Sequence, residues 1–383
     1  MSGKDLPEDH LDAAVATLDS LTTTNPESHS KDTTSSQLQT PADSKKSHSL
    51  FRSVFPYDSL QDFEAEWHLG NYIIDRQTGK KSFEPMPLYV RLGMHLLYYG
   101  TPETTALHWK RTQDLLKAQS LKMGKQYDDP KSKDHIKPFI DSFELQESLK
   151  EMKEPDFTKY RTFNAFFARE IRDDARPQAS PQDLAVVTSP ADCRLTAFPT
   201  VDLATKYWIK GTGFTLPRLF ASDSLAQKMD GGSLVIARLA PQDYHRWHAP
   251  VSGTVESITE VPGTYYTVNP QAITQEGTLD VFCENRRSVM VVRRSPTSSP
   301  VVIIAVGAML VGSIKYNDGV KVGAEIKRGQ CLGAFYYGGS TVIVVYPKGE
   351  IKLDEDLVKN SAEQQCWVAG GGWTCAVKKD KWR

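Results

Sequence analysis

Cysteine is scarce in this sequence, and the few cysteines present show no paired spacing. No Cys-x-x-Cys motif occurs, and the five residues all lie in the second half of the chain: Cys193, Cys283, Cys331, Cys366 and Cys375. An odd number of scattered thiols fits a reducing compartment and buried structural side chains. The pattern argues against a disulfide framework and against a metal site, so we expect neither.

The sequence also lacks an excess of charge and any long apolar run. Its 46 basic residues nearly balance its 47 acidic ones, which argues against a nucleic-acid-binding protein with a global positive field. No stretch approaches the roughly 20 apolar residues that span a bilayer. The longest apolar run, residues 301–312, is β-branched and predicts a buried strand. The first residues lack the apolar core of a signal peptide and the basic character of a mitochondrial presequence, so we expect a cytoplasmic protein.

The composition changes twice along the chain. Residues 1–50 are rich in Ser, Thr, Asp and Lys and are expected to be disordered. Residues 51–150 contain two helix-like segments, 87–100 and 104–123, and the second is followed by Gly124. These helices either pack against the core or face a membrane from which a lipid enters the site, and both hold if different faces are used.

From about residue 185 the pattern predicts short β-branched strands separated by Gly and Pro. The sequence Asn-Asp-Gly at 317–319 is a hairpin signal. Two segments, 249–255 and 319–333, resemble halves of the flattened barrel of biotinyl and lipoyl domains. Neither contains the Met-Lys-Met hairpin that carries biotin, so we interpret them as scaffold. The predicted fold class is α+β, with flattened-barrel (barrel-sandwich hybrid-like) elements in a β-rich core.

The pair Gly339–Ser340 is the most informative feature of the sequence. It lies between two apolar runs that predict strands, and it places a hydroxyl nucleophile next to an unhindered glycine carbonyl. Attack of the Ser340 hydroxyl on the Gly339 carbonyl would convert the amide into an ester. Elimination of that ester and hydrolysis would leave a pyruvoyl group, an electrophile that no ordinary side chain supplies. Taken alone, Gly-Gly-Ser-Thr is also typical of a turn between strands.

Two histidines and one aspartate are candidates to assist this chemistry. His245 and His248 are three residues apart, near one another in a turn and on opposite faces in a strand. They fit a metal pair or two surface histidines equally well by spacing, although no third ligand cluster lies nearby. Asp192 follows Pro190 and could orient an imidazole, or could serve only as a turn residue or cap.

Over roughly residues 85–383 the sequence resembles the phosphatidylserine decarboxylase family. Eight blocks carry the resemblance in the family's order: residues 160–169, 175–177, 189–194, 208–216, 238–248, 263–270, 307–314 and 338–341. Asp-Cys-Arg at 192–194 and Gly-Gly-Ser-Thr at 338–341 are similar to the eukaryotic, non-mitochondrial branch. The resemblance assigns no catalytic role to Cys193, which we interpret as a packing residue.

The resemblance implies a role for each candidate residue. Ser340 would become the pyruvoyl cofactor and the Schiff-base site, with Gly339 supplying the scissile carbonyl. Asp192 and His248 would deprotonate Ser340 during self-cleavage, and His245 would act in decarboxylation. The expected catalytic domain is residues 151–383. Cleavage would divide the whole chain into a beta chain (1–339) and an alpha chain (340–383) that stay associated.

The implied reaction is decarboxylation of phosphatidylserine to phosphatidylethanolamine, by a lyase that works peripherally at endomembranes. Arg246 and Lys210 are candidates to meet the lipid phosphodiester. The implied partners are a phospholipid membrane surface and a second copy of the chain in a homodimer. Two alternatives remain: the same chemistry on a soluble aromatic amino acid, or a lipid-binding relative that never self-cleaves. No leader and no calcium-binding C2 domain is visible in the sequence.

Overall fold

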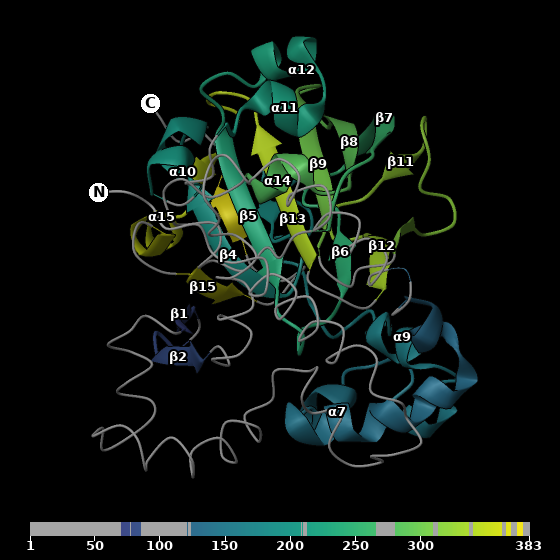
Figure 1. Ribbon diagram of the computed structural model, residues 1–383. Coiled ribbons are helices and arrows are strands. Elements are labelled where there is room, and N and C mark those ends of the chain that lie inside the picture. Colours follow the sequence, from purple (N-terminus) through teal and green to yellow (C-terminus); the bar gives the residue numbers. More distant parts are fainter. Residues whose placement is uncertain are drawn as a thin grey trace, which may run out of the picture.

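A large open sheet forms the centre of the protein (Figure 1). The computed structural model describes residues 70–76, 78–85, 121, 124–207, 209, 213–265, 280–308, 313–336, 340–361, 365–368 and 374–377. Within these residues the sheet has ten strands, in the order β11 (Glu325–Ile326), β7 (Gly253–Val261), β8 (Arg287–Arg294), β9 (Pro300–Gly307), β13 (Ser340–Tyr346), β5 (Ser233–Leu239), β4 (Cys193–Phe198), β15 (Gln365–Val368), β1 (Gly70–Asp75) and β2 (Lys81–Pro85).

The central strands are apolar on both faces because both faces are covered. Along β13, Val342 and Val344 belong to one buried cluster, while Ile343 and Val345 belong to another. Successive side chains of a strand point to opposite sides of a sheet, so a strand with two buried faces shows no alternation of polar and apolar residues. The same explains β9, which confirms a buried strand within the apolar run 301–312.

Two small sheets cover the first face. One has the order β10 (Ser313–Tyr316), β12 (Cys331–Tyr336), β6 (Arg246–His248), and the other β14 (Lys352–Leu353), β16 (Thr374–Val377), β3 (Val187–Thr188). Trp247 of β6 and Phe335 of β12 are fully buried, with ring centroids 4.7 Å apart. Together with helix α15 (Glu355–Ser361) these elements enclose the first core.

Short helices cover the second face. They are α10 (Val201–Tyr207), α11 (Leu216–Phe220), α12 (Asp223–Lys228) and α14 (Val281–Glu284). Leu219 and Phe220 of α11 and Phe282 of α14 pack against the side chains that β9, β13 and β5 direct to this side. Side-chain oxygens of Thr215 and Ser222 accept backbone hydrogen bonds at the starts of α11 and α12, which fixes where each helix begins.

A third, aromatic core lies outside the sheets. It is formed by η1 (Pro130–His135), α7 (Ile136–Ser142), α8 (Gln146–Leu149), η2 (Phe157–Lys159) and α9 (Phe163–Phe167). In Figure 1 this helical cluster lies below the strands, next to β6 and β12. Phe139, Phe163 and Phe167 are in mutual ring contact, and Tyr244 adds a side chain from the segment that leads into β6. The cluster is thereby joined to the sheet side of the molecule.

The architecture agrees with the α+β class. The two segments expected to form barrel halves do meet, since β11 pairs with β7 and the Ala249 backbone exchanges hydrogen bonds with Gly329 and Gln330. The turn at 317–319 forms, with the Val320 amide donating to the Asn317 carbonyl at 3.1 Å. The expected hairpin is wrong, because β10 pairs with β12 and leaves the intervening β11 to the large sheet. Turn chemistry fixes a local reversal but not which strand follows it into the same sheet.

The described residues cover only part of the segments into which the sequence was expected to divide. The segments 1–50, 87–100 and most of 104–123 lie outside the described residues. Residues 70–85 form the β1–β2 pair, which joins the large sheet through parallel pairing of β1 with β15. The aromatic core contains residues on both sides of position 150, so packing contacts cross the expected boundary there. In the described part of the chain, no helix is long and apolar enough to cross a membrane.

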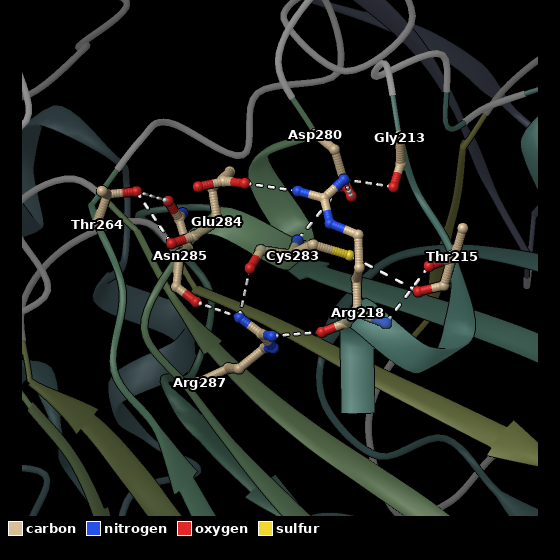
Figure 2. Close-up of polar contacts among 9 residues, drawn as sticks. All are labelled: Gly213, Thr215, Arg218, Thr264, Asp280, Cys283, Glu284, Asn285 and Arg287. Atoms are coloured by element: carbon tan, nitrogen blue, oxygen red, sulfur yellow. Dashed lines mark hydrogen bonds and ion pairs between the residues drawn. The ribbon is translucent and has the colours of Figure 1, made fainter. Parts of the chain in front are cut away.

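The second face is fastened by a network of arginines around α14 (Figure 2). The buried guanidinium of Arg287 donates to the carbonyl oxygens of Arg218, Leu219, Cys283 and Asn285 at 2.6–2.9 Å. Arg218 in turn pairs with Glu284 at 2.6 Å and donates to the Gly213 carbonyl. These bonds tie α11 and α14 to the first residue of β8.

Replacing Arg287 should therefore destabilise the fold. Arg287→Met removes the guanidinium donor from four carbonyl groups, three of them in buried bonds, and we expect the free energy of unfolding to fall by about 3–5 kcal/mol. Urea unfolding of the full chain measures this change. Arg286→Met is the matched control: Arg286 is half-exposed and pairs with Glu260 only at 3.7 Å, so its loss should cost no more than about 0.5 kcal/mol. Equal unfolding midpoints for the two variants would contradict the assignment.

Candidate active site

Ser340 is the first residue of β13 and is completely buried. Its backbone lies between Leu239 of β5 and Gly307 of β9, so both neighbouring strands fix its position. It shares a strand face with Val342 and Val344, which directs its side chain to the side of the small sheets. Gly339, the other member of the predicted cleavage pair, lies outside the described residues.

His245 is the histidine that contacts this serine. Its Nδ1 atom lies 3.3 Å from the Ser340 Oγ atom, and its Nε2 atom lies 2.9 Å from the Ala240 carbonyl oxygen. A carbonyl oxygen only accepts hydrogen bonds, so Nε2 carries the proton and Nδ1 has a free lone pair in the neutral ring. The Ser340 hydroxyl therefore donates to Nδ1.

The surroundings of His245 keep it neutral. Burial and the charges of Arg169 and Arg194 lower its pKa to about 3. The ring of Phe167 is stacked on the imidazole, with centroids 3.9 Å apart. Aromatic packing on one face and two hydrogen bonds at its edge leave the ring a single orientation, with Nδ1 directed at Ser340.

A buried ion pair holds the carbonyl that orients His245. Arg194 of β4 donates to both carboxylate oxygens of Asp243 at 2.5 Å. Asp243 also accepts the backbone N–H of Ala240 at 2.8 Å, which closes a tight turn after β5. The turn presents the Ala240 carbonyl to Nε2 of His245. Because β4 supplies Arg194, the orientation of the histidine depends on pairing of strands distant in the sequence.

His248 occupies a different position from His245. It ends β6, and its Nδ1 atom lies 2.8 Å from the carbonyl oxygen of Gly329. By the same reasoning Nδ1 carries the proton and Nε2 is the acceptor. Burial lowers the pKa of His248, while the negative charge of Asp192 acts in the opposite direction. The His248 backbone N–H donates to the Pro190 carbonyl at 2.7 Å, which brings β6 beside the turn that contains Asp192.

Asp192 is buried at the start of β4 and is held by an arginine. Arg176 donates to its carboxylate from Nε at 3.2 Å and from Nη2 at 2.7 Å, and also pairs with Glu151 at 2.9 Å. This pairing fixes the carboxylate beside the strand that carries His248. Cys193, next in the chain, is a buried core residue, as expected.

The structure therefore brings His245 to Ser340 and Asp192 into the electrostatic surroundings of His248. It gives the two histidines different partners although only two residues separate them, in keeping with the opposite-face alternative. The role assigned to each remains a prediction. Arg246 donates to the Ala168 carbonyl and to Asn317, and pairs with Glu170, so its guanidinium is occupied by the protein itself. Lys210 lies outside the described residues.

Several residues of the site were not singled out from the sequence. Arg176, Phe167 and Arg169 lie inside blocks that carried the family resemblance, and that membership was the only available signal. Ala240 and Gly329 contribute backbone carbonyls, which no side-chain pattern can reveal. Among the described residues, no group of three His, Cys, Asp or Glu side chains is arranged to hold a metal ion.

Comparison with known proteins agrees with the resemblance noted in the sequence. Residues 163–368 match the sequence model of the family described as phosphatidylserine decarboxylase. A phosphatidylserine decarboxylase proenzyme 3 of Schizosaccharomyces pombe is 44% identical over 287 residues, which are 75% of this chain and 29% of that protein. A proenzyme 2 of Oryza sativa is 40% identical over 290 residues, 76% of this chain and 46% of the rice protein.

This chain thus spans between about a quarter and a half of the length of these eukaryotic relatives. A bacterial relative is matched over nearly all of its length. The phosphatidylserine decarboxylase proenzyme of Fusobacterium nucleatum is 34% identical over 288 residues, which are 75% of this chain and 91% of the bacterial protein. The chain belongs to the phosphatidylserine decarboxylase family.

Proposed function

We propose that this chain is a pyruvoyl-dependent phosphatidylserine decarboxylase that first cleaves itself between Gly339 and Ser340. The relatives are named as proenzymes, which supports processing into two chains, and their names specify phosphatidylserine, which supports the lipid substrate. The alternative, a soluble aromatic amino acid, gains no support from these relatives. The intact set of Asp192, His248 and Ser340 argues against a relative that never self-cleaves.

The single observation that carries the proposal is the hydrogen bond between Ser340 and His245. A buried hydroxyl at the start of a central strand, with an imidazole at 3.3 Å, is a nucleophile placed beside a proton acceptor. The same position fits the pyruvoyl group, because conversion of Ser340 would leave His245 next to the new carbonyl. When formed, the pyruvoyl group supplies an electrophilic carbonyl and an electron sink.

Self-cleavage balances without an external reagent other than water. The Ser340 oxygen bonds to the Gly339 carbonyl carbon, the carbon–nitrogen bond breaks, and the Ser340 nitrogen gains the proton that the hydroxyl lost. Loss of the Ser340 α-proton then expels the carboxylate of Gly339. Hydrolysis of the dehydroalanine that remains releases ammonia. The chain needs a base to accept the hydroxyl proton and return it to nitrogen.

His248 is the better base on electrostatic grounds, although His245 makes the contact. Burial lowers the pKa of both histidines, to about 3 for His245, where the charges of Arg169 and Arg194 add to the effect. At His248, Arg246 and Arg176 also lower the pKa, but the Asp192 carboxylate opposes them. We therefore assign self-cleavage to His248 with Asp192, which requires the Ser340 hydroxyl to change its hydrogen-bond partner. His245, fixed by the Ala240 carbonyl, is assigned to proton transfer in decarboxylation.

The proposal extends to the barrel, the domain boundary and the membrane-facing helix that the sequence predicts. We propose that the β7–β11 and β6–β12 pairs are parts of one flattened barrel, that residues 151–383 form the catalytic domain, and that residues 87–100 present an apolar face to the membrane. Such a face would hold the protein at endomembranes without spanning them. A homodimer of the cleaved chains is compatible with this arrangement.

Removing the nucleophile should stop both reactions. We expect Ser340→Ala to stay a single chain and to release no detectable carbon dioxide from phosphatidylserine vesicles, because alanine has no hydroxyl to form the ester. Intact-mass spectrometry follows cleavage, which in the wild type yields a fragment that begins at position 340 with a pyruvoyl group. The adjacent Thr341→Val is the control, since the Thr341 hydroxyl is buried without a hydrogen-bond partner. An unsplit wild-type chain with full activity would refute the proposal.

The two histidines should separate functionally. His248→Ala and Asp192→Ala should remain uncleaved, because Ser340 loses its base. His245→Ala should still cleave, at least in part, but should decarboxylate about 100-fold or more slowly than the wild type. Gel electrophoresis and carbon dioxide release measure the two steps separately. If His245→Ala blocks cleavage while His248→Ala processes normally, the two roles must be exchanged.

Membrane association should depend on residues 87–100. Leu92 and Leu96 are four positions apart and share one face of the expected helix, so Leu92→Asp with Leu96→Asp should weaken vesicle binding. Activity on vesicles should fall with it, while self-cleavage, a reaction within the chain, should continue. Vesicle co-sedimentation and mass spectrometry are the measurements. Failure of the double variant to fold or to cleave would place these leucines in the core.

A further inference from the structure

Arg169 is a buried arginine, and two of its guanidinium nitrogens make no hydrogen bond to the described residues. It directly follows α9 and its C-cap Ala168, and only 2% of its surface is exposed. Its Nε and Nη1 atoms are buried and make no hydrogen bond. The guanidinium carbon lies 4.9 Å above the ring centre of Phe166, a favourable contact that satisfies none of the N–H groups.

This state is costly and differs from that of other buried arginines in the protein. A buried charge without a hydrogen-bonding partner loses several kcal/mol of solvation. Burial lowers the pKa of Arg169 to about 10, yet leaves it charged at neutral pH. Arg287, in contrast, donates to four carbonyl groups, and Arg194 donates to the carboxylate of Asp243. Buried donors without acceptors need an explanation, and a bound anion is one that satisfies two N–H groups of a guanidinium at once.

The nearby anionic groups do not supply that ligand. Asp192 and Asp243 both act electrostatically on Arg169, but Asp192 is hydrogen-bonded to Arg176 and Asp243 to Arg194. The hydroxyl of Tyr160 donates elsewhere, to the Glu154 carbonyl at 3.0 Å. Arg176 and Arg194 thus already hold the two nearby carboxylates, and Arg176 also pairs with Glu151.

Arg169 is linked to the reacting atoms through its neighbours in the chain. Phe167, two residues earlier, stacks on the His245 ring, and the Ala168 carbonyl accepts a hydrogen bond from Arg246 at 2.8 Å. The positive charge of Arg169 lowers the pKa of His245, which shows that the two groups share one buried region. His245 in turn contacts Ser340. An anion bound by Arg169 would thus be held within the reach of a substrate at Ser340.

We propose that Arg169 binds the phosphodiester of the phospholipid substrate through its Nε and Nη1 atoms. The inference rests on the proposed function. It assigns the phosphodiester contact to Arg169 in place of Arg246 and Lys210, the candidates suggested by the sequence. A guanidinium fork matches two oxygens of one oxyanion, which the substrate offers as a phosphodiester and as a carboxylate. The phosphodiester is favoured, because a cation on the carboxylate would stabilise a charge that disappears as carbon dioxide leaves and would raise the barrier.

The test uses probes that cannot react with a pyruvoyl carbonyl because they lack a primary amine. Monomeric dihexanoyl phosphatidylcholine carries the phosphodiester without a carboxylate, and betaine carries a carboxylate without a phosphate. Each is titrated calorimetrically into the full-length processed protein, as wild type, Arg169→Gln, Arg169→Lys and Arg161→Gln. Arg161 is the control, an exposed arginine of the same segment. Melting temperatures and carbon dioxide release from phosphatidylserine are recorded for all four.

We expect Arg169→Gln to bind dihexanoyl phosphatidylcholine about 10- to 100-fold more weakly than the wild type, with Arg169→Lys in between and Arg161→Gln unchanged. The melting temperature of Arg169→Gln should equal or exceed that of the wild type, since an unpaired buried charge is removed. Unchanged affinity in Arg169→Gln, or no binding by the wild type, would overturn the inference.

Two other results would also overturn it. Binding of betaine that is lost in Arg169→Gln, without a change for the phospholipid, would assign the arginine to the carboxylate. A lower melting temperature in both Arg169 variants would make the residue structural. A wild-type protein that binds the phospholipid but releases no carbon dioxide would instead refute the proposed function and leave this inference standing.

Discussion

The hydrogen bond between Ser340 and His245 depends on the position of β13 at the middle of the large sheet. β13 pairs along its whole length with β5 and along most of it with β9, and both of its faces are buried. A serine at the first position of such a strand cannot move without breaking pairs on both sides. β5 also leads directly into the turn that carries Ala240 and His245, so the strand that fixes the nucleophile fixes its partner as well. Scaffold and site are therefore one structural unit.

Three arginines, of which Arg194 and Arg287 are buried and Arg176 partly buried, connect that unit to the rest of the protein. Arg194 donates to Asp243, which in turn accepts the Ala240 N–H, and Arg176 donates to Asp192. Arg287 donates to four carbonyl groups in and next to α11 and α14. The planar guanidinium provides several donors in fixed directions, which suits it to joining segments that lack regular pairing. Arg169 is also buried, but its Nε and Nη1 atoms have no acceptor among the described residues, and our proposal of a binding role rests on this contrast.

The electrostatics of the two histidines follow from their neighbours. His245 lies among cationic groups and under Phe167, so it stays neutral and keeps one tautomer. Burial also lowers the pKa of His248, but the neighbouring Asp192 carboxylate opposes this shift, and no such carboxylate effect acts on His245 among its main causes. A chain that first cleaves itself and then decarboxylates a lipid needs two proton-transfer steps under different conditions. Two imidazoles in different surroundings fit the two steps that we propose, although only Arg246 and Trp247 separate them in the chain.

The sequence alone determined the buried strand in the run 301–312, the α+β class and family membership. Each of these inferences uses only the composition of a segment or the order of residues within it. It also brought Asp192, His245, His248 and Ser340 forward as candidates. The partner of each histidine was decided only by the tertiary structure, because the i, i+3 spacing fits both a turn and a strand. Their orienting groups, the carbonyls of Ala240 and Gly329, belong to the backbone and leave no trace in a side-chain pattern. The pairing of β10 with β12 and the unpaired state of Arg169 were likewise beyond local patterns, since both depend on which distant segments pack nearby.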